Sequence, residues 1–164
     1  MTLWGTRGSL PAPGPDTMRY GGNTSCVTVR NGQGELLILD AGTGIRRVGS
    51  LIQDDDTDIH ILLTHLHMDH IQGLGFFEPL FHEGRRVQIW GPPSTSGSLA
   101  RRLGRYLSPP LFPVRLNEVA SIVSCQDVIN RTFDVGSFQV TGELVCHPDP
   151  TLGYRISCEG KTVA

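Results

Sequence analysis

The pattern of apolar and polar positions predicts several strands in the first half of the chain. Residues 24–30 alternate as in a half-buried strand, whereas residues 35–40 and 58–64 are apolar runs typical of buried strands. The Asn-Gly pair at 31–32 predicts a hairpin turn between the first two strands. A further strand is expected over residues 86–90.

Helical periodicity lies between these strands. Residues 45–53 indicate a short helix, and residues 71–81 indicate a helix that is broken near Pro79. Residues 96–107 predict a third helix, because its leucines recur every four positions and form one apolar stripe.

The second half returns to short strands, expected around Val123 and over residues 132–135, 138–145 and 154–158, with turns at "DVGS" and "CEGK". Strands grouped at both ends of a mixed chain are typical of an α/β sandwich, with two sheets packed face to face and helices outside. The length of 164 residues suits a single domain over residues 1–164.

Composition and net charge give limited information about function. A net charge of −2 gives no general attraction to nucleic acid or anionic membranes, so an anionic substrate needs local groups or a metal. The start of the chain lacks the pattern of a signal peptide, and no apolar run could cross a bilayer, so we expect a cytoplasmic protein. The cysteines are scattered, which favours free thiols, and Cys146 is expected to point into the core.

The stretch "LLTHLHMDHIQG", residues 62–73, holds three of the six histidines. His65 and His67 are two apart at the end of a strand and therefore project to the same side. Asp69 and His70 follow in the turn, where they can reach the same point. Imidazoles and a carboxylate that converge in this way are ligands of zinc and similar divalent ions.

These residues resemble the metal-binding signature of the metallo-β-lactamase-fold hydrolases. "THLHMDH" carries the resemblance, supported by "LILDAGTGI", "WGTRGSLPAPGP", "YGGNTSCV" and "CHPDPTLGYRIS". Together the segments resemble the ribonuclease Z and cyclic-phosphodiesterase branch. The resemblance implies an α+β fold, the αββα sandwich, and a site for two adjacent metals, zinc or alternatively manganese or iron.

Carried over to this chain, the resemblance implies that His65 and His67 form the first metal site together with His147. Asp69 and His70 would begin the second site, and Asp69 would also orient the attacking water as a catalytic residue. In the family, an aspartate after the "GYRI" strand bridges the metals and a further histidine completes the second site. The sequence ends before either position, so we expect a domain that lacks its C-terminal part.

The implied activity is hydrolysis by a metal-activated water, with a phosphodiester such as a cyclic nucleotide or an RNA end as substrate. Thioesters and lactones are alternatives within the enzyme class. A different class is a chain that binds metal without turnover, either as a truncated product or as a ligand-sensing module. Expected partners are a small-molecule or nucleotide substrate, with nucleic acid as substrate only, and a second copy in a homodimer; no membrane is expected.

Other polar residues have competing interpretations. Asp40 either hydrogen-bonds a ligand histidine or caps the "GTG" turn. His60 is expected to be structural, and His82 to lie in a loop. Arg7 and Asn23 stand in glycine-rich loops whose role the sequence leaves open. The basic helix face, either solvated or a phosphate clamp, is formed by Arg101, Arg102 and Arg105.

Overall fold

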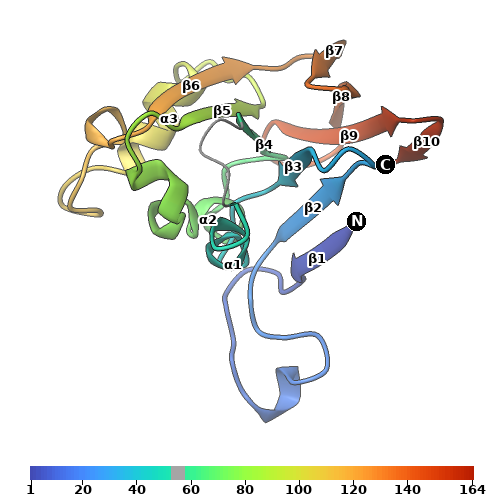
Figure 1. The fold of residues 1–164 in the computed structure, drawn as a ribbon. Helices are drawn as coiled ribbons and strands as arrows, with labels where there is room; N and C mark the ends of the chain where they lie inside the picture. Colours follow the sequence, from blue (N-terminus) through green and yellow to red (C-terminus); the bar gives the residue numbers. More distant parts are fainter. Residues whose placement is uncertain (53–57) are drawn as a thin grey trace.

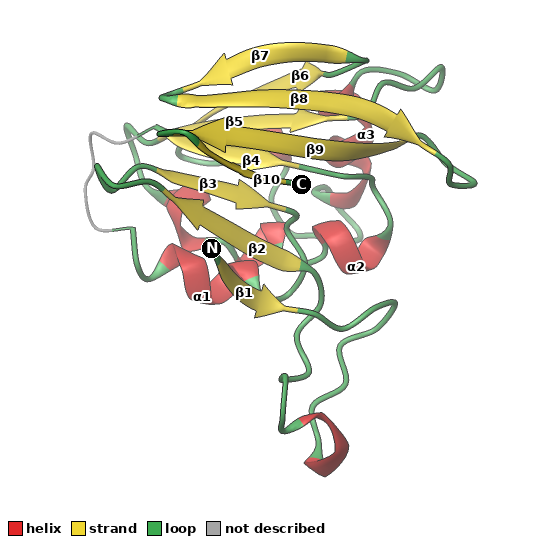
Figure 2. Ribbon diagram, turned by 90° about the vertical axis from the view of Figure 1, so that its right-hand side faces the viewer, coloured by secondary structure: helices red, strands yellow, loops and turns green. Residues whose placement is uncertain are grey.

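The computed structural model describes residues 1–52 and 58–164 and contains two β-sheets (Figures 1 and 2). The larger sheet has six strands in sequence order, parallel from the third strand onward and antiparallel before it. Its strands are β1 (Thr2–Gly5), β2 (Cys26–Arg30), β3 (Leu36–Leu39), β4 (Ile59–Leu62), β5 (Arg86–Gly91) and β6 (Ile122–Asp127).

The smaller sheet is antiparallel and comes from the last third of the chain. Its order is β10-β9-β8-β7. The strands are β7 (Arg131–Val135), β8 (Phe138–Val145), β9 (Thr151–Cys158) and β10 (Lys161–Val163).

The two sheets pack face to face, and the helices cover the outer face of the larger sheet (Figure 2). The described residues therefore form three layers of the αββα arrangement. The α-helices are α1 (Ile45–Gly49), α2 (Met68–Ile71) and α3 (Leu99–Tyr106). Short 3₁₀ turns occur at Pro15–Thr17, Leu74–Phe76, Glu78–Phe81 and Leu116–Glu118.

The burial of strand β4 explains why its residues are almost all apolar. Ile59 and Ile61 belong to the core beneath the helices, whereas Leu62 belongs to the core between the sheets. A strand that is buried on both faces needs apolar residues at successive positions, and this produces a continuous run instead of an alternation. The burial also fixes the end of β4, where the histidine-rich segment begins.

The middle of the chain is less helical than its pattern predicts. Helix α1 ends at Gly49, and residue 53 of the expected helix lies outside the described residues. The expected helix over residues 71–81 is wrong in form, because only α2 and two 3₁₀ turns occur there. Glycines at 73 and 75 and the proline at 79 interrupt the segment.

Two further differences concern strands and cysteines. The pattern did not indicate β1, and β9 begins three residues earlier than expected, at Thr151. All four cysteines are free, as expected, but Cys146 is exposed and does not lie in the core, because it follows β8 in an open loop. None of the helices in the described part of the chain has the length and apolarity needed to cross a membrane.

Candidate metal centre

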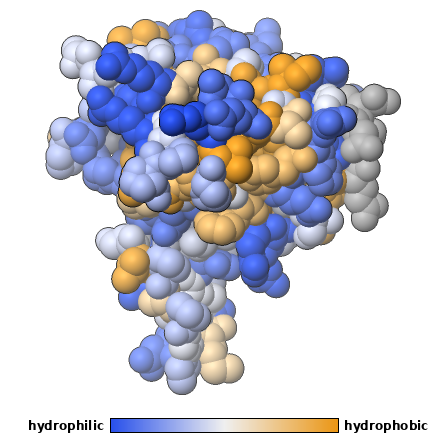
Figure 3. Space-filling model, turned by 90° about the vertical axis from the view of Figure 1, so that its left-hand side faces the viewer, coloured by the Kyte–Doolittle hydropathy of each residue, from blue (hydrophilic) through white to orange (hydrophobic). Residues whose placement is uncertain are grey.

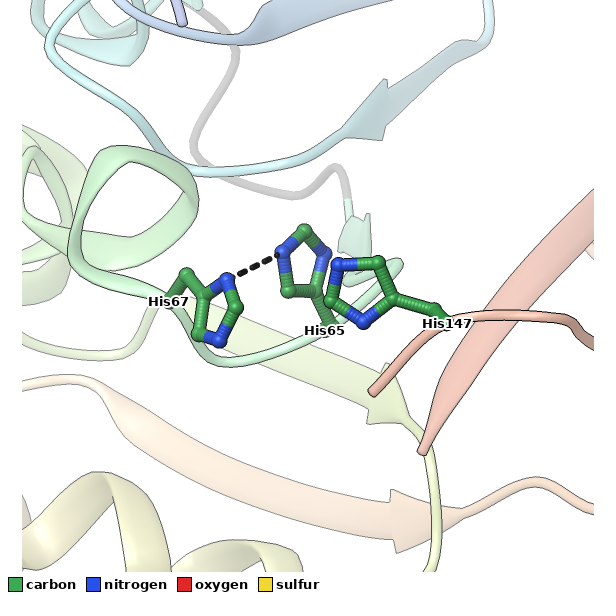
Figure 4. A group of neighbouring side chains, drawn as sticks. All are labelled: His65, His67 and His147. Atoms are coloured by element: carbon green, nitrogen blue, oxygen red, sulfur yellow. Dashed lines mark hydrogen bonds between the residues drawn. The ribbon is translucent and has the colours of Figure 1, made fainter. Parts of the chain in front are cut away.

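Three histidines meet at the edge of the larger sheet (Figure 4). His65 and His67 lie in the segment between β4 and α2, and His147 lies in the loop between β8 and β9. One ring nitrogen of each lies within 4.8 Å of the others. The site thus forms where the carboxyl end of a parallel strand meets a loop of the second sheet, a usual position for ligand sites in such folds.

Contacts between the sheets hold this loop in place. The backbone N–H of Leu152 donates to the carbonyl of Thr64 at 2.8 Å. The buried hydroxyl of Tyr154 donates to the carbonyl of Leu63 at 2.9 Å. Both bonds join the start of β9 to the segment just before His65, and they keep His147 beside it.

A chain of hydrogen bonds orients the ring of His65. The hydroxyl of Thr64 donates to the carboxylate of Asp40 at 2.9 Å. Because that hydroxyl has a single proton, its oxygen accepts from Nδ1 of His65, which lies 3.0 Å away. Nδ1 therefore carries the ring proton, and Nε2 of His65 presents a lone pair.

The ring of His67 is oriented by Asp149, whose Oδ2 lies 2.9 Å from Nε2 of His67. A carboxylate oxygen accepts, so Nε2 donates to Asp149, and Nδ1 is the nitrogen that faces the cluster. Nδ1 of His67 lies 3.1 Å from Nε2 of His65. These two nitrogens are within hydrogen-bond distance (Figure 4), so either a shared proton or a metal ion can lie between them.

This separation fits a metal. Two nitrogen ligands at about 2.0–2.1 Å from one zinc, at the tetrahedral angle, lie about 3.3 Å apart. Burial, followed by the nearby imidazoles of His70 and His67, lowers the pKa of His65 to about 4. His65 is therefore neutral at pH 7, as a metal ligand must be. The donors present fit a zinc ion held by three imidazoles.

Asp69 and His70 lie beside this cluster. The rings of His65 and His70 are 4.1 Å apart between centroids, and Oδ2 of Asp69 lies 3.5 Å from Nε2 of His70. Nδ1 of His70 lies 2.7 Å from the carboxylate of Asp40, so Nε2 is the free nitrogen, directed toward Asp69. The five residues predicted from the sequence are thus brought together.

The pKa values of His70 and Asp69 are shifted in opposite directions. Burial opposes protonation of His70, but the hydrogen bond and negative charge of Asp40 outweigh it and raise the pKa of His70. Burial also opposes ionisation of Asp69, but the backbone N–H of Ser9, 2.8 Å away, and the charge of His70 lower its pKa. Asp69 is ionised at neutral pH.

Asp40 supports His65 and His70 through hydrogen bonds. Its carboxylate accepts from Thr64 and Ser25 and is paired with His70, so it supports His65 through Thr64 and His70 directly. Of the two interpretations left open by the sequence, these contacts match the bond to a ligand histidine.

Sequence reasoning missed Thr64, Asp149 and Ser9. Thr64 directly precedes the first histidine and Asp149 lies two residues after His147, so proximity along the chain was the available signal. Ser9 contributes its backbone N–H, which no side-chain pattern can reveal. His60 faces the space between the sheets, and His82 pairs with Glu78 on the surface; neither is in the cluster.

A sandwich of two sheets, with a histidine cluster that could hold a metal ion at the end of a parallel strand, defines the class of this α/β protein. The family model of the beta-lactamase superfamily domain matches residues 36–164. The chain belongs to this superfamily.

Individual relatives agree with this assignment. A ribonuclease Z from Haloarcula marismortui is 31% identical over 157 residues, which cover 94% of this chain and 46% of the relative. The short form of human tRNase Z aligns with a TM-score of 0.67 at 19% identity, over 98% of this chain and 66% of that chain. Zn²⁺-bound PqqB from Methylobacterium extorquens aligns with a TM-score of 0.60 at 21% identity, over 84% and 50%. The chain spans about half the length of the curated relatives it matches.

Proposed function

We propose that this protein hydrolyses phosphodiester bonds with a water activated by zinc, on a nucleotide or an RNA end. The observation that carries the proposal is the pair of facing ring nitrogens of His65 and His67, 3.1 Å apart, with His147 beside them. That separation is close to the spacing of two imidazole ligands on one zinc ion. Three imidazole ligands leave one tetrahedral position open, which is the pattern of a catalytic zinc site.

Each residue has a role in this proposal. His65, His67 and His147 would hold the ion, which would lower the pKa of a coordinated water to about 7. Asp69 orients that water, because its carboxylate is ionised and fixed by the N–H of Ser9. Asp69 and Nε2 of His70 face each other at 3.5 Å and offer donors for a second ion. Asp40 and Asp149 hold the imidazoles in their binding tautomers.

The phosphodiester class rests on the relatives. Ribonuclease Z and tRNase Z are nucleases by name, and they cover most of this chain. Zinc is supported by the donor set and by the relative with bound Zn²⁺. Thioesters and lactones remain the competing substrates, since the same activated water attacks carbonyl carbon.

Turnover tests the proposal. Zinc-loaded protein is incubated with bis(p-nitrophenyl) phosphate, with an RNA that has a 3′ extension, and with a thioester and a lactone. We expect hydrolysis of the first two, abolished in His67→Ala and retained in His82→Ala, whose histidine pairs with Glu78 outside the cluster. Hydrolysis of only the thioester or lactone would overturn the phosphodiester assignment.

A second candidate is metal binding without turnover. It is favoured by the small ligand set of the second site, for which Asp69 and His70 are the donors in contact among the described residues. Two donors bind an ion weakly compared with the usual four. One zinc per chain together with no turnover of any of the four substrates would select this candidate.

A further inference from the structure

A cavity of about 270 Å³ opens directly beside the metal centre. His67 and Asp149 form the wall nearest the histidine cluster. Arg102 and Arg105 of α3 are also part of the lining, together with Ser94 and Ser96. A group bound in this cavity would therefore lie next to a substrate held at the metal.

Arg102 and Arg105 differ in their exposure and in their contacts. Arg102 is mostly buried, and its guanidinium donates to the carbonyls of Gly97 and Pro92 and to Asp127. These bonds use Nε and Nη2 of the guanidinium, and Asp127 offsets its charge, so the protein's own groups hold Arg102 in place. Arg105 lies one turn further on the same face of α3 and is exposed. Within residues 1–52 and 58–164, the Arg105 side chain has no hydrogen-bond or ion-pair partner.

The serines come from the loop that follows β5. This strand is the parallel neighbour of β4, so its loop emerges at the same edge of the sheet as His65 and His67. The hydroxyls of Ser94 and Ser96 lie 2.9 Å apart, and the backbone N–H of Ser96 donates to Ser94. The loop thus presents two hydroxyls in a fixed turn on the cavity that Arg105 also lines.

We propose that Arg105, with the hydroxyls of Ser94 and Ser96, binds a second phosphate group of the substrate. This inference rests on the proposed phosphodiesterase function and specifies its substrate: a nucleotide or RNA terminus with a further phosphate next to the scissile diester. A guanidinium without a partner and two hydroxyls supply the charge and the donors that a phosphate needs.

The charges in the cavity are compatible with an anion. Arg102 is paired with Asp127, and the carboxylate of Asp149 is hydrogen-bonded to Nε2 of His67. Arg105 is the cation that remains without a counter-ion among the described lining residues. Of the two interpretations of the basic helix face, the clamp therefore applies to Arg105, and the solvated face applies to Arg101, which is exposed and lies outside the lining.

Binding measurements test this subsite separately from catalysis. Zinc-loaded protein is titrated by calorimetry with thymidine 3′,5′-bisphosphate and with thymidine 5′-monophosphate. We expect the bisphosphate to bind about tenfold more tightly than the monophosphate, a factor that one charge-assisted contact supplies. The variant Arg105→Ala should bind both equally, Arg105→Lys should retain part of the preference, and Arg101→Ala should retain all of it.

Three results would overturn the subsite. These are equal affinity for both nucleotides in the parent protein, including no binding of either, an unchanged preference in Arg105→Ala, or an equal loss in Arg101→Ala, which would indicate a general effect of charge. Failure of the proposed function is distinguishable. In that case the bisphosphate preference persists and depends on Arg105, while the turnover assays with bis(p-nitrophenyl) phosphate and RNA are negative.

Discussion

At the scale of residues, the histidine cluster depends on side chains that do not bind metal themselves. Thr64 donates a hydrogen bond to Asp40 and accepts one from His65, and Asp149 fixes the ring of His67. These contacts decide which nitrogen of each ring faces the centre. Without them each imidazole could adopt the other tautomer and turn its proton toward the ion.

Replacing Thr64 by valine should therefore weaken zinc binding. The change keeps the volume of the side chain but removes the acceptor for Nδ1 of His65. We expect a loss of about 10–100-fold in zinc affinity, the usual effect of removing a partner of a ligand histidine. Competition with a chromophoric chelator measures it. Thr132→Val is the matched control, because Thr132 contacts only Thr141 on the surface among described hydrogen bonds and should leave the affinity unchanged.

Acid should destabilise the metal-free protein through His65. Burial, followed by the imidazoles of His70 and His67, places the pKa of His65 at about 4, below its ordinary 6.5. Between pH 6.5 and 4 the unfolded chain takes up a proton that the folded chain does not, so stability falls as pH falls. The whole shift corresponds to about 3 kcal/mol. His70 acts in the opposite sense, because its pKa is raised.

Urea unfolding of metal-free protein at pH 7 and pH 4.5 measures this effect. In His65→Gln the loss of stability between the two pH values should be clearly smaller than in the parent. Identical losses in the two proteins would contradict the assignment to His65.

At the scale of elements, the position of α2 depends on close backbone packing. The N–H of Gly73 donates to the carbonyl of Ala41 at 2.9 Å, and a Cβ at Gly73 would lie 2.1 Å from the carbonyl oxygen of Gly42. Helix α2 is thereby docked on the turn after β3, with Asp69 and His70 directed toward the cluster. No larger residue fits at this contact without moving the helix.

Gly73→Ala should destabilise the protein by about 1–3 kcal/mol, as overpacking does, and should weaken zinc binding by displacing α2. Gly104→Ala is the control, because a Cβ at this position of α3 meets nothing within 4 Å. The control should be neutral or more stable by up to about 1 kcal/mol, since alanine favours helix. Thermal unfolding and zinc titration of both variants measure the contrast. Equal effects at the two positions would show that the close contact is unimportant.

The elements differ in how well their sequence predicts them. Strand β8 has the bounds that its pattern indicates, because both of its ends are marked by turns. The segment after α2 does not form the predicted helix. Its apolar residues pack in the core beneath the helices, and this tertiary packing, not a helical period, determines their spacing. Strand β1 has only four residues, and three of them are exposed or half-exposed. Apolar and polar residues do not alternate in it, so the strand is defined by its pairing with β2.

The residues of the candidate metal centre could be predicted from the sequence, whereas the hydrogen bonds that orient them could not. The spacing of His65 and His67 at a strand end was sufficient to place them together. His147 came from the family resemblance, because no local pattern can show that a loop 80 residues later folds onto the cluster. Thr64 and Asp149 act through hydrogen bonds that exist only in the folded chain.

At the scale of the whole molecule, the two sheets share one site. The larger sheet provides His65 and His67, and the smaller sheet provides His147 from a loop that also contains an exposed thiol, Cys146. Figure 3 shows the polar and apolar surface on one side of the molecule, with a narrow arm below the body. We propose that the imidazole of His147, and not the neighbouring thiol, completes the site.

X-ray absorption at the zinc edge tests this claim most directly, on protein loaded with one equivalent of zinc. We expect three imidazole nitrogens and one further light atom, all at about 2.0–2.1 Å. In His147→Ala one imidazole contribution should disappear. A sulfur scatterer at about 2.3 Å, or a spectrum unchanged by His147→Ala, would show that His147 is not a ligand of the zinc.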